Sequence, residues 1–378
     1  MKAAILHALG TPLVIETVPD PIAGPGEVVV DVVAAPVLSY TNEVFDGTRT
    51  YHLTFPMTPG CGAVGRVRAT GPDATRLAPG DWVFCDPTVR ARDSAPDIML
   101  QGWTAPTKGA ERLQQWMRDG AFAEQMRVPM ECVFPLGDIA PADASRWCAS
   151  VVMLVPYGGW LASGLQPGET ALVNTATGNF GSAAVAVALA MGAGTVLATG
   201  RNEAALADIA RRFGARARPV RLLGDADADT ASMKEAAQGP IDRVLDILPP
   251  LPDAAPVRAA AMSVRANGSV VLMGGLGVDV ALPYRWIMRN NITICGQWMC
   301  PRDAVPRFIS LVRSGLLSLG SVDITEFPLA GINEAIAHAA AHAGAFRLTV
   351  LRPWAPTALG GAEAHERSRG APAWATVS

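Results

Sequence analysis

Hydrophobic positions in the first 135 residues fall in short, β-branched runs that glycine and proline separate. Residues 27–33 (Glu-Val-Val-Val-Asp-Val-Val) form a continuous β-branched run, and short predicted strands follow at 65–69 and 81–84, each bounded by turn residues. Short apolar runs bounded by turn residues are typical of strands, and many of them at close spacing predict a barrel-like β domain. Residues 88–119 contain many arginines, aspartates, serines and prolines, and they predict a long surface excursion.

From about residue 168 the pattern changes to strand-length apolar runs that alternate with segments of helical period. Predicted strands lie at 170–174, 195–199, 243–248, 269–273 and 346–351, and predicted helices at 181–191, 203–213, about 302–316 and 331–344. Strands that alternate with helices predict a parallel sheet with right-handed crossovers. The tail at 353–378 is rich in Ala, Gly, Pro and Ser and predicts a loose C-terminal extension.

Residues 147–165 carry no charge over nineteen positions, which is close to a membrane-spanning length. Pro156, Gly158 and Gly159 interrupt the middle of this run, so it favours a buried helix with a close backbone approach. The composition, 50% hydrophobic and 17% charged, is that of a globular protein. The net charge of -3 argues against nucleic acid or an anionic membrane as a partner, because neither attracts a chain that has no basic excess.

Six cysteines are scattered along the chain without a C-x-x-C pair. This spacing fits neither a disulfide framework nor a zinc ribbon. The N-terminal residues show neither the apolar segment nor the small-residue cleavage site of an export signal. We therefore expect reduced thiols in a cytoplasmic protein.

A glycine motif directly follows the strand at 170–174 and opens the next helix. Gly178 would let the main chain approach a pyrophosphate, and Gly181 would let the helix pack closely on the sheet. The first N–H groups of the helix would then face the anion, and a second strand ends about twenty residues later, as a dinucleotide-binding motif requires. The first glycine of the usual G-x-G-x-x-G is absent. The candidate cofactor-binding residues here are Thr175, Thr177, Gly178, Asn179, Phe180 and Gly181.

The second strand ends in Thr199, Gly200, Arg201 and Asn202. An NAD enzyme usually places an aspartate or glutamate here, where it accepts hydrogen bonds from the ribose hydroxyls. A carboxylate would repel a 2′-phosphate, whereas Gly200 leaves room for it and Arg201 offers a bidentate fork. These four residues are therefore candidate cofactor contacts, and they predict NADPH rather than NADH.

Several motifs, in this order along the chain, resemble those of the medium-chain dehydrogenase/reductase superfamily. They are Pro-Gly-Glu-Val-Val-Val at 25–30, Pro-Gly-Asp-Trp-Val at 79–83, Gly-Ala-Phe-Ala-Glu at 120–124 and Pro-Gly-Glu-Thr-Ala-Leu-Val at 167–173. The resemblance covers about residues 1–352 and implies an α/β protein with two domains and a substrate cleft at their junction. A GroES-like β-barrel catalytic domain would comprise residues 1–150 and 298–352, and a Rossmann domain with a doubly wound parallel sheet would comprise 151–297, followed by the extension at 353–378.

The resemblance also suggests further cofactor contacts and an oligomeric state. Gly274, Gly275 and Leu276 resemble the loop that contacts the nicotinamide ribose, and Gly296 belongs to a segment similar to the last cofactor-side strand. The β segment at 278–290 corresponds to the edge that pairs between subunits in relatives, so a homodimer is expected.

The sequence departs from the zinc-dependent members of this superfamily. Leu38 stands where they have a cysteine ligand, and Cys61-Gly62 replaces their His-Glu. Leucine cannot bind zinc, and one thiolate does not supply the three protein ligands of a catalytic site. Residues 88–119 contain no cysteine for a structural zinc lobe. His338 and His342 stand at i, i+4 but lack a third ligand, so we predict no metal.

Without zinc, a hydroxyl is the natural donor for charge that develops on the substrate. The resemblance places Tyr40 and Thr41 in the loop of the zinc enzymes' first ligand and proton relay, and Tyr157 where the backbone passes the nicotinamide. These three are the candidate catalytic or substrate-contact residues, although either tyrosine alternatively only packs in the core. The candidate pocket residues are Cys61, His52, Trp103 and Trp298.

Two enzyme activities and one other function fit these features. The first is NADPH-dependent, zinc-independent reduction of an activated C=C bond in an enone or quinone, as in the zinc-free quinone reductases that the sequence resembles. The second is zinc-independent carbonyl reduction or alcohol oxidation. The third is a non-catalytic NADPH-binding protein.

Overall fold

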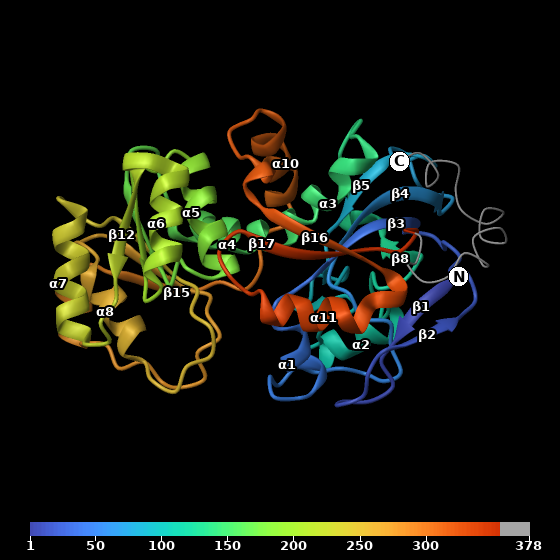
Figure 1. Ribbon diagram of the computed structural model, residues 1–378, viewed down its shortest axis with the longest axis horizontal. Helices are drawn as coiled ribbons and strands as arrows, with labels where there is room; N and C mark the ends of the chain where they lie inside the picture. The colour runs from blue at the N-terminus through green and yellow to red at the C-terminus, as the bar shows by residue number, and fades with distance from the viewer. Residues whose placement is uncertain (356–378) are drawn as a thin grey trace. The chain divides into compact units, whose positions relative to one another are not determined.

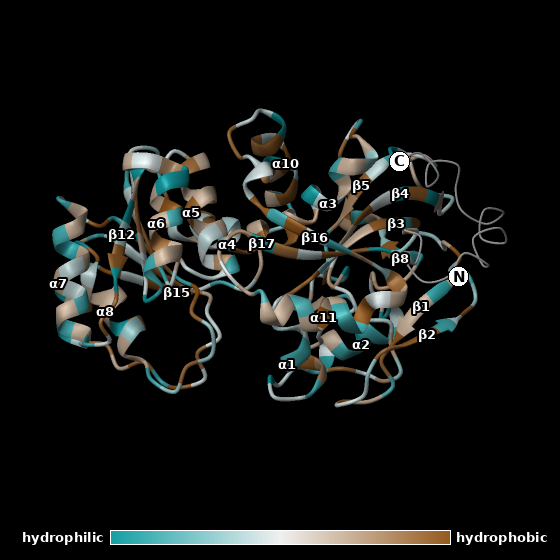
Figure 2. Cartoon of the chain, in the orientation of Figure 1, coloured by the Kyte–Doolittle hydropathy of each residue, from teal (hydrophilic) through white to brown (hydrophobic). Residues whose placement is uncertain are grey.

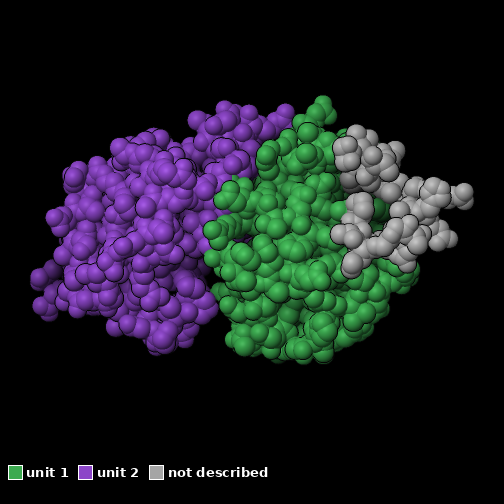
Figure 3. Space-filling view, viewed as in Figure 1, with its two compact units in different colours: residues 1–151, 322–343, 347–378 green, residues 152–321, 344–346 purple. Residues whose placement is uncertain are grey.

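The chain folds into two compact units, which Figure 3 colours separately. The computed structural model describes residues 1–355, so the predicted extension lies outside the described residues from 356 on. Unit 1 comprises residues 1–151, 322–343 and the chain from 347, and unit 2 comprises 152–321 and 344–346. Residues 298–321, which we assigned from the sequence to the split catalytic domain, group with unit 2 in this division.

Unit 1 is built around a mixed seven-stranded sheet with the order β16-β17-β3-β4-β5-β9, in which β8 also pairs with β3. Its strands are β3 (Glu27–Val37), β4 (Ala63–Thr70), β5 (Trp82–Cys85), β8 (Gln125–Pro129), β9 (Val133–Pro135), β16 (Asp323–Pro328) and β17 (Arg347–Arg352). Two small sheets join β1 (Lys2–Ile5) to β2 (Val14–Thr17) and β6 (Thr88–Arg90) to β7 (Ile98–Leu100). The valine-rich strand β3 is buried along its whole length because strands pair with it on both edges.

Short helices cover the strands of unit 1 (Figure 1). They are α1 (Thr41–Phe45), α2 (Lys108–Trp116), η1 (Met130–Cys132), η2 (Pro141–Asp143), α3 (Ala144–Trp147), η5 (Leu329–Gly331) and α11 (Ile332–Ala341). The prediction that 88–119 is a surface excursion is wrong. This segment forms β6, β7 and α2, and it buries several of its apolar side chains, among them Val89, Met99, Trp103 and Met117.

Unit 2 has a six-stranded sheet in which all strands are parallel, with the order β12-β11-β10-β13-β14-β15. Its strands are β10 (Thr170–Asn174), β11 (Thr195–Gly200), β12 (Ala217–Arg221), β13 (Arg243–Asp246), β14 (Ser269–Leu272) and β15 (Thr293–Gly296). Strand order reverses between β10 and β13, which defines a crevice at their carboxyl ends. The topology confirms the predicted Rossmann sheet.

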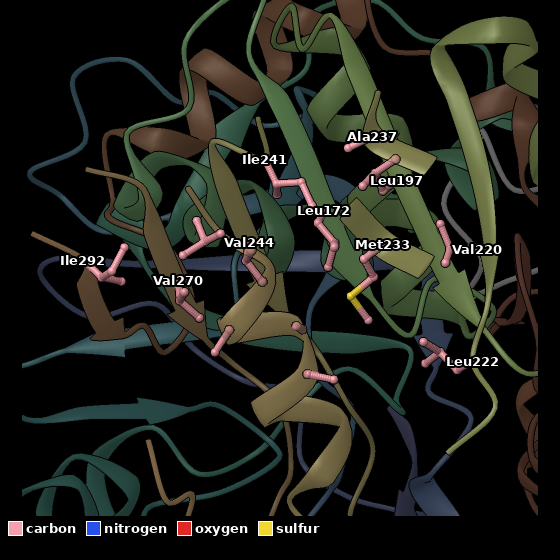
Figure 4. Packing of buried hydrophobic residues seen from close by; sticks show 14 residues of the cluster. Leu172, Leu197, Val220, Leu222, Met233, Ala237, Ile241, Val244, Val270 and Ile292 are labelled. Carbon is pink, nitrogen blue, oxygen red and sulfur yellow. The ribbon is translucent and has the colours of Figure 1, made fainter. Parts of the chain in front are cut away.

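Helices pack on this sheet through its apolar side chains. They are α4 (Ala149–Ser163), which begins in unit 1, α5 (Asn179–Ala190), α6 (Glu203–Phe213), η3 (Gly214–Arg216), α7 (Ala226–Ala237), α8 (Ala255–Ser263), α9 (Tyr284–Arg289), α10 (Ala304–Arg313) and η4 (Leu319–Ser321). Figure 4 shows one core cluster, in which Leu172, Leu197 and Val244 of the strands meet Met233 of α7. Each such buried side chain contributes about 1.5–3 kcal/mol. In Figure 2, α7 carries both hydrophilic (teal) and hydrophobic (pale brown) residues, as a helix with one buried face does.

The uncharged run at 147–165 begins with the last residue of α3 and forms α4, as the prediction of a buried helix requires. A side chain on Gly158 would collide with the backbone of Met299, and one on Gly159 would collide with Met273. This confirms the close backbone approach. Among the described residues, no helix is long and apolar enough to cross a membrane.

The prediction of a β segment at 278–290 is wrong. Helix α9 begins after Pro283, whose carbonyl accepts hydrogen bonds from Trp286 and Ile287, and the described sheet ends at β15 on this side. Proline lacks the N–H that an extended ladder needs, whereas it is well tolerated at a helix start. The expected pairing edge between subunits is therefore not formed by these residues as a strand.

Candidate active site

The loop after β10 is held by the neighbouring strand β11. The Thr175 N–H donates to Thr199 Oγ1 at 3.0 Å, and the Ala176 N–H donates to the Thr199 carbonyl at 2.6 Å. Thr175 has a φ of 66°, in the left-handed region that a threonine rarely adopts. These bonds offset that strain and turn the chain sharply from strand into helix at the carboxyl end of the sheet.

The two glycines of the motif have different surroundings. Gly178 precedes α5, no side chain caps that helix end, and a Cβ on Gly178 would have no heavy atom within 4 Å. A Cβ on Gly181 would instead collide with the Thr175 carbonyl oxygen. Gly178 therefore borders open space at the N-terminus of α5, beside Asn179 and Phe180, whereas Gly181 lets the helix lie against the loop. This arrangement fits a pyrophosphate cradle.

The end of β11 carries an arginine that is not engaged by another residue. Arg201 is exposed and forms no ion pair within the described chain. Arg221 lies opposite Gly200 across β11 and β12, and it pairs with Glu203 at 2.5 Å. Asn202 Oδ1 accepts the Ala205 N–H at 3.1 Å and so caps α6. The guanidinium of Arg201 thus remains available to an anion beside Gly200, and the Asn202 side chain serves the helix.

A buried carboxyl that sequence reasoning missed lies at the crevice. Asp246 ends β13, and its Oδ1 accepts a hydrogen bond from Asn174 Nδ2 at 2.9 Å. Burial raises the pKa of Asp246 to about 6, and the Asn174 bond lowers it in part. The one available sequence signal was an acidic residue inside an otherwise apolar strand.

The remaining predicted cofactor residues lie at the same carboxyl edge. A Cβ on Gly274 would approach the Leu248 N at 2.8 Å and Asp246 Oδ2 at 2.9 Å, and the Gly275 N–H donates to the Leu248 carbonyl at 2.7 Å. Leu276 follows in this loop, and Gly296 ends β15 with open space around its Cα. The sheet thus gathers the predicted cofactor residues at the ends of adjacent strands.

In unit 1, Tyr40 belongs to an aromatic cluster. Its ring centroid lies 6.4 Å from that of Tyr51 and 5.9 Å from that of Trp103, which meets both tyrosines edge-on. The guanidinium carbon of Arg49 lies 4.1 Å from the centroid of the Tyr40 ring. Burial raises the pKa of Tyr40 well above its usual value, and the Arg49 charge opposes this shift. Sequence reasoning missed both Tyr51 and Arg49.

Cys61 lies close enough to Tyr40 to influence its ionisation. The thiol is buried, and burial together with the nearby Asp86 raises its pKa. A protonated thiol is a poor nucleophile and a poor metal ligand. Cys61 is therefore suited to line the space near Tyr40 as an apolar residue.

The other two predicted residues of this region have different settings. Thr41 is buried, and its hydroxyl donates to the Leu38 carbonyl at 2.6 Å, so this hydroxyl holds the start of α1. His52 is exposed, and its backbone N–H donates to Thr104 Oγ1 at 3.2 Å.

Tyr157 and Trp298 belong to unit 2. Tyr157 is buried, its ring centroid lies 5.8 Å from that of Phe308, and burial raises its pKa. Trp298 is 44% exposed. The structure thus groups Tyr40, Cys61 and Trp103 in unit 1.

The residues at the expected zinc position do not fit a zinc ion. Leu38 is a buried hydrocarbon, and Gly62 has a φ of 81° and would place a Cβ 2.9 Å from Val151. The rings of His338 and His342 stack with centroids 4.1 Å apart, and His338 Nδ1 hydrogen-bonds to Thr349 Oγ1 at 3.0 Å. Within residues 1–355, no three His, Cys, Asp or Glu side chains are grouped as a metal site would need.

Two family models match most of the chain. Residues 24–138 match the alcohol dehydrogenase GroES-like domain, and residues 180–314 match the zinc-binding dehydrogenase model. The chain belongs to the medium-chain dehydrogenase/reductase superfamily, a family of nicotinamide-dependent dehydrogenases. It is an alcohol dehydrogenase-like oxidoreductase of small molecules. The two family matches, together with the sheet of unit 2, confirm the predicted GroES-like and Rossmann domains.

Relatives of known name support this assignment. An alcohol dehydrogenase of Rhizobium meliloti is 32% identical over 51% of this chain and 55% of its own length. An alcohol dehydrogenase of Geobacillus stearothermophilus is 26% identical over 83% of this chain and 90% of its own length. The acryloyl-coenzyme A reductase of Metallosphaera sedula is 28% identical over 54% of this chain and 60% of its own length.

Solved structures share the fold. The alcohol dehydrogenase TADH from Thermus sp. ATN1 superposes with a TM-score of 0.76 at 23% identity, over 93% of this chain and 100% of that one. A zinc-binding dehydrogenase from Sinorhizobium meliloti 1021, described as putative and bound to NADP, gives a TM-score of 0.74 at 22% identity, over 93% and 99%.

Proposed function

We propose that this protein is an NADPH-dependent, zinc-independent reductase that transfers a hydride to the activated C=C bond of an enone or quinone. The observation that carries the proposal is the Tyr40 side chain, which lies in an aromatic cluster beside Arg49. The family resemblance assigns Tyr40 to the loop in which zinc enzymes have their first ligand and proton relay. A phenol there supplies a proton donor without a metal.

The preference for NADPH rests on the end of β11. Arg201 forms no ion pair with a described residue, and no carboxylate occupies the position after Gly200. Glu203 is the nearest acid along the chain and is neutralised by Arg221. A 2′-phosphate would therefore meet a free guanidinium instead of a repelling carboxylate. The NADP-bound relative of this fold offers a parallel.

When bound, NADPH supplies the hydride. The loop at Thr175–Gly181 would bind its pyrophosphate, Arg201 its 2′-phosphate, and Gly274 with Gly275 would allow the backbone to approach its nicotinamide ribose. Tyr40 would donate its proton to the oxygen on which negative charge develops, or to the enolate formed after hydride addition. Cys61 and Trp103 would line the space beside it.

Carbonyl reduction or alcohol oxidation is the second candidate, because the same phenol can protonate an alkoxide. Several relatives bear the name alcohol dehydrogenase. The C=C bond is favoured because no three His, Cys, Asp or Glu side chains within residues 1–355 are grouped to hold a zinc ion that would polarise a carbonyl, and because one relative is named an acryloyl-coenzyme A reductase.

A substrate panel tests the proposal. The protein is mixed with NADPH or NADH and with enones, quinones or aldehydes, and loss of the near-ultraviolet absorbance of the reduced nicotinamide is followed. We expect faster turnover of an enone or quinone than of any aldehyde, and a preference for NADPH. Turnover of aldehydes alone favours the second candidate. NADPH binding without any turnover indicates a non-catalytic binding protein.

The proposal includes a cytoplasmic homodimer. All six cysteines are free, as a reducing compartment would require. Unit 2 exposes the apolar side chains of Val278, Met288 and Trp298, which a second subunit would cover. Sedimentation equilibrium that gives the mass of one chain contradicts the dimer.

A further inference from the structure

The proposed reaction leaves Tyr51 and Arg49 without a role, although both contact Tyr40. We propose that Tyr51 returns a proton to Tyr40 after each turnover, and that Arg49 stabilises the phenolate that Tyr40 becomes in between. This inference rests on the proposed function of Tyr40. It makes Tyr51 and Arg49 positioning residues that act on the substrate only through Tyr40.

The side chains of Tyr40 and Tyr51 are neighbours, and Tyr51 contributes to the raised pKa of Tyr40. Their rings lie 6.4 Å apart at an angle of 35°, and Trp103 packs edge-on against both, at 5.9 Å from Tyr40 and 6.2 Å from Tyr51. Trp103 is itself buried, and Phe45 packs against it at 5.7 Å. Packing therefore fixes the two rings beside each other, an arrangement that would let a proton pass between their hydroxyls.

Arg49 provides a positive charge beside both tyrosines. Its guanidinium carbon lies 4.1 Å from the centroid of Tyr40 and 6.0 Å from that of Tyr51. Glu43 faces Arg49 at 3.7 Å but is 48% exposed, whereas Arg49 is 21% exposed, so solvent screens the carboxylate more than the guanidinium. The other titratable group facing Tyr40 is Cys61, a thiol that burial keeps neutral. A phenolate on Tyr40 would therefore be stabilised mainly by Arg49.

The proton balance closes without another reactant. The Oη–H bond of Tyr40 breaks as its proton joins the substrate, which has accepted the hydride and its electron pair from NADPH. The Tyr40 phenolate then takes the hydroxyl proton of Tyr51. Tyr51, which is only half-buried, takes its own replacement from water, so each turnover consumes one proton from solvent.

The first test compares Tyr51→Phe with the intact protein. The substitution keeps the ring and its packing, and removes only the hydroxyl. We expect kcat to fall about tenfold, a share of the effect that general acids usually have, while KM changes by less than about twofold. The solvent deuterium isotope effect on kcat should rise. Tyr284→Phe, which removes an 81% exposed hydroxyl from α9, is the matched control and should change none of these.

The second test addresses Arg49. Arg49→Gln should lower kcat and move the alkaline limb of its pH profile upward, because Tyr40 loses the charge that stabilises its phenolate. Arg49→Lys should restore part of the rate, since it keeps the charge. If Arg49→Gln only weakens thermal stability and leaves the pH profile unchanged, Arg49 is a packing residue and this part is overturned.

A measurement on the cofactor-free protein separates this inference from the proposed function. With isotope-labelled tyrosine, the Cζ resonance of Tyr40 should shift in Tyr51→Phe and remain in place in Tyr284→Phe. An unshifted Tyr40 resonance, or an unchanged kcat and isotope effect in Tyr51→Phe, overturns the relay. If Tyr40→Phe retains full turnover, the proposed proton donor itself is wrong.

Discussion

Asn174 at the end of β10 donates a 2.9 Å hydrogen bond to Asp246 at the end of β13, which joins the two strands at which the order of the sheet reverses. Asn174 Oδ1 also accepts from Thr199 of β11 at 3.3 Å. One amide side chain thus connects three strands beneath the proposed cofactor crevice. The carboxyl that it binds is buried and is not paired with a described cation.

Asp246→Asn should stabilise the protein at neutral pH. The pKa of Asp246 is about 6 in the folded protein, whereas the ordinary pKa of an aspartate is 3.8. At a pH between these two values, Asp246 holds a proton in the folded protein that it has lost in the unfolded chain. Stability therefore falls as pH rises through this window, by on the order of 1 to 3 kcal/mol. In denaturant unfolding, the free energy of unfolding of the variant should fall less steeply than that of the intact protein between about pH 4 and about pH 6, the range that the two pKa values define. A variant with the same pH dependence as the intact protein contradicts this account.

Arg201→Ala should weaken NADPH binding and leave NADH binding nearly unchanged. Hydrogen bonds to charged groups contribute about 1.5–3 kcal/mol, so the loss should be about tenfold to a hundredfold. Fluorescence titration with both cofactors measures the ratio. Arg211→Ala, which removes another exposed arginine of the same region, is the control. If Arg201→Ala leaves the ratio of affinities unchanged, the assignment of the 2′-phosphate to Arg201 fails.

Gly178→Ala and Gly181→Ala should have opposite phenotypes. Alanine at 178 meets no protein atom, so the melting temperature should stay close to that of the intact protein while NADPH affinity falls about tenfold, or about 1.4 kcal/mol. Alanine at 181 collides with the Thr175 backbone and should cost about 1–3 kcal/mol of stability. Equal cofactor affinity in Gly178→Ala and the intact protein would show that the pyrophosphate lies elsewhere.

Tyr40→Phe should lower kcat by about a hundredfold to ten-thousandfold, the usual contribution of a general acid. Binding of NADPH should be unaffected, because the cofactor-binding residues belong to unit 2. Steady-state kinetics together with a cofactor titration separates the two effects. A loss of NADPH binding in this variant would point to a folding defect instead.

Chelation should not inactivate the enzyme. With Leu38, Cys61 and Gly62 at the expected ligand positions, no catalytic zinc needs to be retained. Prolonged dialysis against a strong chelator, followed by assay and elemental analysis, checks this. Activity that disappears and returns on addition of zinc would require a ligand set that these residues do not supply.

Much of the fold follows from local patterns. The runs at 27–33 and 170–174 are β-branched and continuous because both strands are buried, and Gly178 with Gly181 marks the turn into α5. The segment at 88–119 was misjudged because its buried residues alternate with charged and turn-forming stretches, and their burial depends on distant parts of unit 1. Periodicity carries no such information.

The candidate site was only partly predictable for a similar reason. Tyr40 and Arg201 stand next to recognisable motifs. Tyr51 and Arg49 can be linked to the site only from the structure, in which the Tyr51 ring and the Arg49 guanidinium contact Tyr40. Asp246 and Asn174 are 72 residues apart and become partners through parallel pairing of β10 with β13. Such pairs arise from topology, which a single sequence does not specify.

The pairing of β17 with β3 has a consequence for synthesis of the chain. Thr349 lies opposite Val37, so this edge of β3 stays unpaired until the ribosome has made β17, long after β3 itself. Unit 2 is nearly complete before β17 leaves the ribosome, and domains generally fold as they emerge. We therefore expect unit 2 to fold first. Until β17 pairs with β3, this part of β3 exposes unpaired N–H and C=O groups to which proteases and chaperones can bind.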